Sequence, residues 1–366
     1  GADLERSQKI LELVRIAESA STDKNEEKLQ IPSFEDARIH DLSGKNHLVL
    51  DKKIAEKRFE ALEIPIKPES IAEEQGAKLV FDDAALNKTG IYLYPKLAYG
   101  ILNGGSATSY ADKKKNQSLS PEAYSMFERE FESLADGIKE LPKGISSAFI
   151  NLDGSQGPSF ILLKMRSLLL HALKYRNLAN DALTPILPFF QMTSRATDKA
   201  LQDAYSHYRE NPLLRDLIEQ SNYDPTKPLS KIQSLIAALT HKNSGKPRQF
   251  FDQAFGKPDS GLALPGGHGE NFRVLASVYR DLYKQGVRYA YLGNVDNSGY
   301  TIDPCELAVF ALQGYDDSCE RQELEAASRY NGAFEFSWKT AMDIKGGILV
   351  EKENGRLSVA DIGQAI

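Results

Sequence analysis

From residue 91 onward, short apolar runs alternate with helical patterns, and this alternation restricts the fold more than any other feature of the chain. It is typical of α/β proteins, because each helix carries the chain back to begin a parallel strand beside the previous one. The sequence therefore predicts a mainly parallel sheet flanked by helices. The predicted strands are 97–102, 147–152, 186–192, 249–255 and 289–292.

Apolar positions spaced three and four residues apart predict the helices between these strands. These helices are 121–134, 158–175, 197–208, 272–285 and 304–313, and residues 211–246 are predicted to form a helical insertion. Pro185 and Pro188 accompany the strand at 186–192, which we therefore expect to be irregular or at a sheet edge, because proline cannot donate to a strand ladder. Residues 332–366 are predicted to form antiparallel strands.

Residues 1–90 lack the alternation of strand and helix patterns. Amphipathic spacing predicts helices at 4–20 and 52–62, and the rest of this segment is polar and mixed. We interpret 1–90 as a mainly helical N-terminal extension and 91–366 as the α/β domain.

Composition excludes several classes of protein. The formal net charge is −6, so nucleic acid is not an expected partner. Two cysteines without a CxxC pair argue against a disulfide framework or a zinc ribbon and favour a reducing compartment. No apolar run approaches the ~20 residues of a membrane span, and the N-terminus has no signal-peptide core. The sequence predicts a cytoplasmic protein without a membrane partner.

Polar loops follow several of the predicted strands. In open α/β sheets, ligands bind outside the carboxyl ends of the strands, so loops that converge there describe a site. The loops are Asn103-Gly104-Gly105, Met192-Thr193-Ser194, 265–270 and 294–297.

Individual residues in these loops indicate phosphate chemistry. Gly104 and Gly105 allow the backbone to approach a phosphate or a base, and a lysine cluster at 113–115 follows them. Asp296 lies between two asparagines, which suits Mg²⁺ held by one carboxylate together with phosphates and waters. His268 among glycines suits hydrogen bonding better than zinc, because no second zinc ligand lies near it.

Two further patterns bear on the class of enzyme. Lys339 and Lys345 lie near Gly346-Gly347 between predicted strands, where they can direct positive charge into a site. The phosphate-binding pattern GxxxxGK[ST] and the dinucleotide pattern GxGxxG are both absent.

Taken together, these segments resemble the UTP-dependent sugar-1-phosphate uridylyltransferases, the UDP-glucose and UDP-N-acetylhexosamine pyrophosphorylases. The family patterns LNGGxGT, MTS, PPGHGD, NxDNLG, KTxxDxKGGTL and LLEIAQV find counterparts in the same order. Those counterparts are 102–108, 192–194, 265–270, 294–299, 339–349 and 358–366. Ala107 and Ala111 stand where the family has glycine, and the chain ends before the family's C-terminal domain, which we expect to be absent.

The resemblance implies a Rossmann-like nucleotidyltransferase fold of the GT-A type, with a mixed sheet. It implies a transfer from UTP to a sugar 1-phosphate that yields a UDP-sugar and pyrophosphate, with Mg²⁺ bound by Asp296. Lys113, Lys339 and Lys345 would neutralise phosphate charge. The implied substrate contacts are Gly104, Gly105, Thr108, Thr193, Gln253, Gly267, His268 and Asn297.

Some alternatives stay open at this stage. Gln220, in an EQS context, competes with Gln253 as the glutamine that reads uracil. The sugar and the oligomeric state are not determined by the sequence. A catalytically inactive protein that binds UDP-sugars is the alternative function, and measuring pyrophosphate release would distinguish the two.

Overall fold

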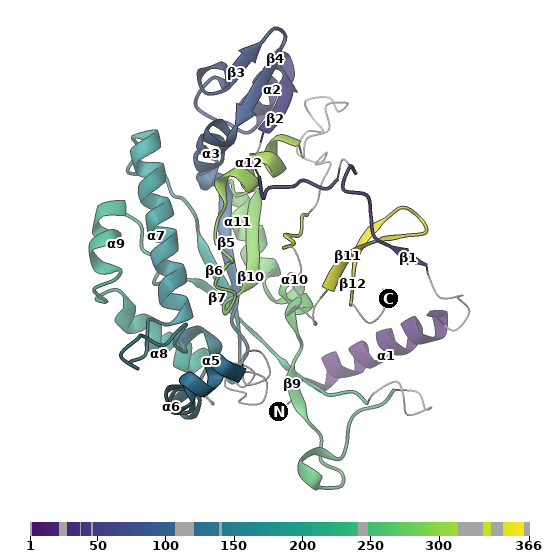
Figure 1. Ribbon diagram of the computed structural model, residues 1–366. Coiled ribbons are helices and arrows are strands. Elements are labelled where there is room, and N and C mark those ends of the chain that lie inside the picture. The colour runs from purple at the N-terminus through teal and green to yellow at the C-terminus, as the bar shows by residue number, and fades with distance from the viewer. Residues whose placement is uncertain are drawn as a thin grey trace.

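The computed structural model describes residues 2–21, 28–36, 38–44, 47–106, 121–138, 141–240, 248–313, 332–337 and 347–361. Its centre is a 4-stranded sheet in the order β10-β5-β6-β7 (Figure 1). Every pair of neighbouring strands in this sheet is parallel, which confirms the α/β fold and makes the described sheet parallel rather than mixed. The strands are β5 (Leu97–Leu102), β6 (Phe189–Ser194), β7 (Leu229–Gln233) and β10 (Tyr289–Asn294).

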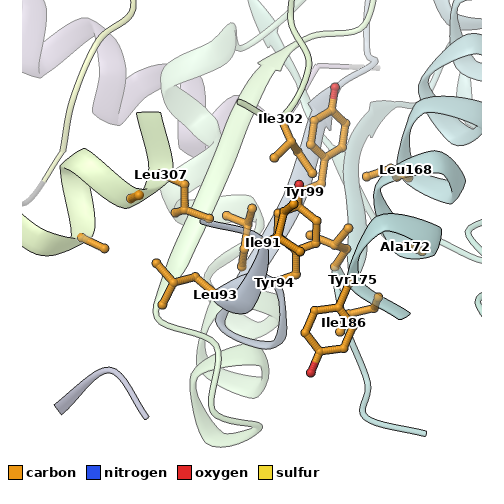
Figure 2. Packing of buried hydrophobic residues seen from close by; sticks show 14 of the residues in the cluster. Ile91, Leu93, Tyr94, Tyr99, Leu168, Ala172, Tyr175, Ile186, Ile302 and Leu307 are labelled. Atoms are coloured by element: carbon orange, nitrogen blue, oxygen red, sulfur yellow. The ribbon is translucent and has the colours of Figure 1, made fainter. Parts of the chain in front are cut away.

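Helices cover both faces of the central sheet because its strands alternate their apolar side chains. Leu97, Tyr99 and Ile101 point into the larger core, whereas Ala98 points into a smaller core on the opposite face. Figure 2 shows Tyr99 packed among side chains from several elements of the larger core. The larger core includes α3 (Asp83–Tyr92), α7 (Phe160–Ala179), α8 (Asp198–Tyr208), α9 (Arg215–Ser221) and α12 (Pro304–Gln313). The smaller core includes α10 (Asn271–Val274) and α11 (Ala276–Lys284).

The N-terminal segment contains the two predicted helices, α1 (Leu4–Ser21) and α2 (Lys52–Ala61). It also contains a 3-stranded antiparallel sheet that the sequence analysis missed, β2-β4-β3, formed by β2 (His47–Asp51), β3 (Glu73–Gln75) and β4 (Lys78–Asp82). The interpretation of 1–90 as mainly helical was therefore incomplete. Its boundary also falls inside α3, whose Leu86 and Ile91 are buried in the larger core.

The predicted helical insertion at 211–246 is wrong beyond its first helix, α9. Residues 229–233 form β7, a strand of the central sheet, and residues 235–237 form β8 (Leu235–Ala237). β8 pairs with β9 (Ala263–Pro265) in a 2-stranded antiparallel sheet. A short apolar run fits either helix or strand, and here the pairing of β7 with β6 decides the outcome.

Other predictions are corrected locally. Residues 121–134 form two helices, α5 (Pro121–Met126) and α6 (Glu128–Ile138), and residues 147–152 form isolated bridges rather than a strand. Residues 249–255 and 332–337 are not strands either. The strand after Pro188 is an inner strand of the sheet and not an edge strand, because the proline precedes its first residue.

The last described strands confirm part of the C-terminal prediction. β11 (Gly347–Lys352) and β12 (Leu357–Asp361) pair in antiparallel fashion, and β1 (Leu29–Gln30) adds to β11. Within the described residues, no helix is both long and apolar enough to cross a membrane.

Candidate active site

The carboxyl ends of the central strands lie side by side. Asn294 of β10 is in register with Leu102 of β5, and Leu102 is in register with Met192 of β6. Ser194, the last residue of β6, pairs with Gln233, the last residue of β7. The loops that follow β5 and β10 therefore begin at one edge of the sheet, as the sequence predicts.

An ion pair joins the segment after α6 to the turn after β10. Lys143 Nζ lies 2.8 Å from Asp296 Oδ2, and both side chains are about one-quarter exposed, at 25% and 29%. The backbone of Lys143 is also fixed, because its N–H donates to the carbonyl oxygen of Gly105 over 3.1 Å. The pair thus places one cation and one carboxylate, both reachable from solvent, beside the Gly104-Gly105 loop.

Gln233 lies behind the glycine loop. Its side chain is 3% exposed, and its Oε1 is buried without a hydrogen-bond partner. A Cβ atom added at Gly104 would lie 2.4 Å from Gln233 Nε2, whereas one added at Gly105 would make only ordinary contacts of 3.6 Å with Lys143. Neither glycine adopts a positive φ. Close packing against this amide therefore favours glycine at 104, whereas the backbone conformation does not require it.

A buried hydrogen-bond network holds the ends of β5 and β6 together. Asn103 Nδ2 and the Tyr205 hydroxyl both donate to Gln191 Oε1 over 3.0 Å, and Gln191 Nε2 donates to Ser230 Oγ over 2.8 Å. Because each buried polar group would be costly without a partner, the network favours one arrangement of this edge.

A buried lysine supports the turn that carries Asp296. Lys164 of α7 is 3% exposed, and its ammonium donates to the carbonyl oxygens of Asn297, over 2.6 Å, and of Tyr300. It also lies 5.0 Å from the centre of the Tyr300 ring. Burial lowers the pKa of Lys164 to about 8, although the negative charge of Asp296 acts in the opposite direction. A cation in this position adds positive potential beneath the sheet edge.

The 265–270 loop continues from β9 into α10, which contacts β7. Gly267 has a φ of +89°, a backbone conformation that favours glycine. His268 is exposed, while Glu270 is buried and paired with Arg6 and Arg273. Burial opposes ionisation of Glu270, but the two arginines outweigh it and lower the pKa of this carboxyl.

The predicted substrate residues differ in their location and burial. Asp296, Gly104 and Gly105 come together as expected, and Asn297 is exposed in the same turn as Asp296. Thr193 is fully buried and its hydroxyl donates to Asp198 over 2.7 Å. Thr108, Lys113, Lys339 and Lys345 lie outside the described residues.

Neither predicted uracil glutamine lies at the sheet edge. Gln220 is in α9, and Gln253 is in the loop that joins β8 to β9, which extends beyond β9 in Figure 1. Gln233 occupies the end of a strand instead. The sequence analysis missed it because its segment was interpreted as a helix, although Gln233-Ser234 repeats the QS pair on which the choice of Gln220 rested.

Lys143 and Lys164 were also missed. Lys143 follows Pro142 in an unremarkable loop, and Lys164 lies within an otherwise apolar helix. The latter carries a usable signal, because a lysine among the apolar positions of a buried helix requires polar partners.

The donor set is suitable for one kind of metal site. Asp296 offers a single carboxylate, and the described residues contain no cluster of metal-ligating side chains. Mg²⁺ is commonly held by one or two carboxylates with substrate phosphates and waters, so the residues present fit that mode.

A parallel sheet with a lysine, a carboxylate and a glycine loop at its carboxyl edge is an α/β protein with a candidate site where such sheets bind their ligands. The sequence then specifies the family. Residues 154–365, more than half of the chain, match the family described as UTP--glucose-1-phosphate uridylyltransferase, and the chain belongs to that family.

One solved structure supports the fold. The chain is similar to a uridine diphosphate N-acetylglucosamine pyrophosphorylase from Trypanosoma brucei, with a TM-score of 0.50 and 17% identity over 77% of this chain and 45% of that one. It is also similar to a UDP-glucose pyrophosphorylase mutant from Leishmania major in complex with UDP-glucose, with a TM-score of 0.41 and 17% identity over 82% and 48% of the two chains. The chain thus spans about half the length of these proteins. No curated protein sequence matches it significantly.

Proposed function

We propose that this protein transfers the uridylyl group of UTP to a sugar 1-phosphate and releases pyrophosphate. The observation that carries the proposal is the Lys143–Asp296 pair at the ends of β5 and β10, beside Gly104-Gly105. Membership of the uridylyltransferase family supports the choice of UTP as the nucleotide.

The reaction requires positioning and charge neutralisation more than proton transfer. An oxygen of the sugar phosphate attacks the α-phosphorus of UTP, a new P–O bond forms, and the bond to the leaving pyrophosphate breaks. The attacking phosphate is already an anion at pH 7, so no general base is needed. The negative charge that crowds the transition state is what the protein must stabilise.

Residues of this chain have distinct roles in the proposal. Lys143 donates to the α-phosphate or to the leaving group, and Gln233 presents its unpartnered Oε1 and its amide to the uracil edge. Asp296 would hold Mg²⁺, which when bound neutralises phosphate charge. Lys339 or Lys345 would pair with the sugar phosphate.

The direct test is release of pyrophosphate from UTP and Mg²⁺ with a panel of sugar 1-phosphates, including glucose 1-phosphate and N-acetylglucosamine 1-phosphate. We expect release with at least one of them, and formation of UTP when the matching UDP-sugar and pyrophosphate are supplied. Calorimetric binding of UDP-sugars without turnover on the whole panel would contradict the proposal and favour a binding protein.

A prediction follows for the glycine loop. Gly104→Ala is expected to raise the Kd for UTP by about tenfold, ~1.4 kcal/mol, because the new methyl group displaces the amide of Gln233. Gly44→Ala is the matched control, because Gly44 is exposed, lies outside the candidate site and has open space for a Cβ. Calorimetric titration with UTP measures both variants. Unchanged affinity of Gly104→Ala would separate Gln233 from nucleotide recognition.

A further inference from the structure

The N-terminal helix is attached directly to the segment that carries the candidate site. The backbone N–H of Asp3 donates to the carbonyl oxygen of Leu235, and the N–H of Ala237 donates to Ser7 Oγ over 2.9 Å. Ser7 is 1% exposed. The first turn of α1 is therefore joined to β8, which begins two residues after Gln233.

From this anchored turn, Arg6 reaches the 265–270 loop. Its Nη2 lies 2.5 Å from Glu270 Oε1, and Glu270 Oε2 accepts from Arg273 Nε over 2.9 Å. The carboxylate is 8% exposed, so both arginine contacts are made in a poorly solvated setting. Charge-assisted hydrogen bonds of this kind are about twice as strong as neutral ones.

The Glu270 side chain also fixes the glycines that precede it. A Cβ at Gly266 would lie 2.7 Å from Glu270 Cγ, so this side chain folds back against the loop. The N–H of Glu270 donates to the carbonyl oxygen of Gly267 over 3.2 Å. Glu270 thus packs against Gly266 and bonds through its backbone to Gly267, the two residues that precede His268.

We propose that Arg6 is a positioning residue for the nucleotide: by binding Glu270, the N-terminal helix holds the 265–270 loop in the conformation that receives UTP. This inference rests on the proposed function. Residues of the N-terminal segment, which we interpreted from the sequence as an extension, thereby become part of the architecture of the site. Linkage then requires that nucleotide binding stabilise α1 in return.

The test compares substrate affinity with turnover. We expect Arg6→Gln to raise the KM for UTP by about tenfold, with kcat within about twofold of wild type, because the loop binds the nucleotide but the charge-neutralising groups are unaltered. Arg15→Gln is the matched control: Arg15 lies on the same helix and donates to the carbonyl oxygen of Arg248 over 2.9 Å, away from Glu270. It should leave the KM unchanged.

Two further measurements test the route through Glu270 and the coupling of the nucleotide to α1. In a Glu270→Gln background, Arg6→Gln should add little, because the two residues act through one contact; a full additional effect on the KM would show that Arg6 does not act through Glu270. Hydrogen exchange should show α1 amides better protected with UTP in wild type, and this gain should disappear in Arg6→Gln.

The possible failures are distinguishable. If wild type turns over UTP and Arg6→Gln keeps the wild-type KM, the inference is overturned and the proposed function stands. If wild type neither binds nor turns over UTP, the proposed function fails and the inference fails with it.

Discussion

Lys143→Met is expected to lower kcat about 10²- to 10³-fold, comparable to the loss of one preorganised donor to a developing negative charge. The ammonium lies beside Asp296 at the sheet edge, where the phosphates of UTP would be placed. The fold should persist, because a partly exposed ion pair contributes only ~0–1 kcal/mol and the backbone contact with Gly105 does not need the side chain.

Steady-state pyrophosphate release at saturating UTP and Mg²⁺ measures this effect, and thermal unfolding checks the fold. Lys284→Met, an exposed lysine of α11, is the matched control and should keep wild-type kcat. Asp296→Asn should lose activity to a similar or greater extent. A kcat for Lys143→Met within a few-fold of wild type would show that this lysine is only an ion-pair partner.

Lys164→Met is expected to change how stability depends on pH and to reduce turnover. The pKa of Lys164 is about 8 in the folded protein, below its usual value of 10.5, because the ammonium is buried. Between these values the unfolded chain binds more protons, so the free energy of unfolding rises with pH in wild type. Below pH 8 Lys164 is protonated in both the folded and the unfolded chain, so the full cost of burying its charge lowers the free energy of unfolding.

Methionine cannot titrate, so the variant should lack this rise. Between pH 7.5 and pH 9.5 the wild-type free energy of unfolding should gain about 2 kcal/mol relative to the variant, as urea titrations would measure. Turnover should fall about tenfold, since the turn that carries Asp296 loses its support. Lys174→Met, an exposed position of the same helix, serves as the control. Parallel pH profiles for wild type and Lys164→Met would contradict the assignment.

Local sequence patterns predicted those elements whose boundaries depend on near neighbours. The strand at 97–102 and the helix at 304–313 are confirmed at both ends, because each is bounded by its own signals and has a clear apolar pattern. The polar loops after the predicted strands also suggested a site at the carboxyl edge of the sheet, because the strands of a parallel sheet all end at the same edge.

Tertiary pairing decided what local patterns left ambiguous. Residues 229–233 resemble a helical segment in isolation, yet they form β7 because β6 offers a parallel partner, and this places Gln233 at the site. The antiparallel sheet of β2, β4 and β3 was missed for a related reason: its short strands lie in a polar, mixed sequence and their pairing is not a local property.

The sequence by itself therefore determined the α/β class and the family patterns, and it predicted Asp296 and Gly104 as candidate site residues. Only the tertiary structure brought Lys143 to Asp296, Lys164 to the carbonyl oxygens of the Asp296 turn, and Arg6 to Glu270. These contacts join residues more than a hundred positions apart, and no sequence spacing encodes them. They form because strand register and helix packing bring distant loops to one edge of the sheet.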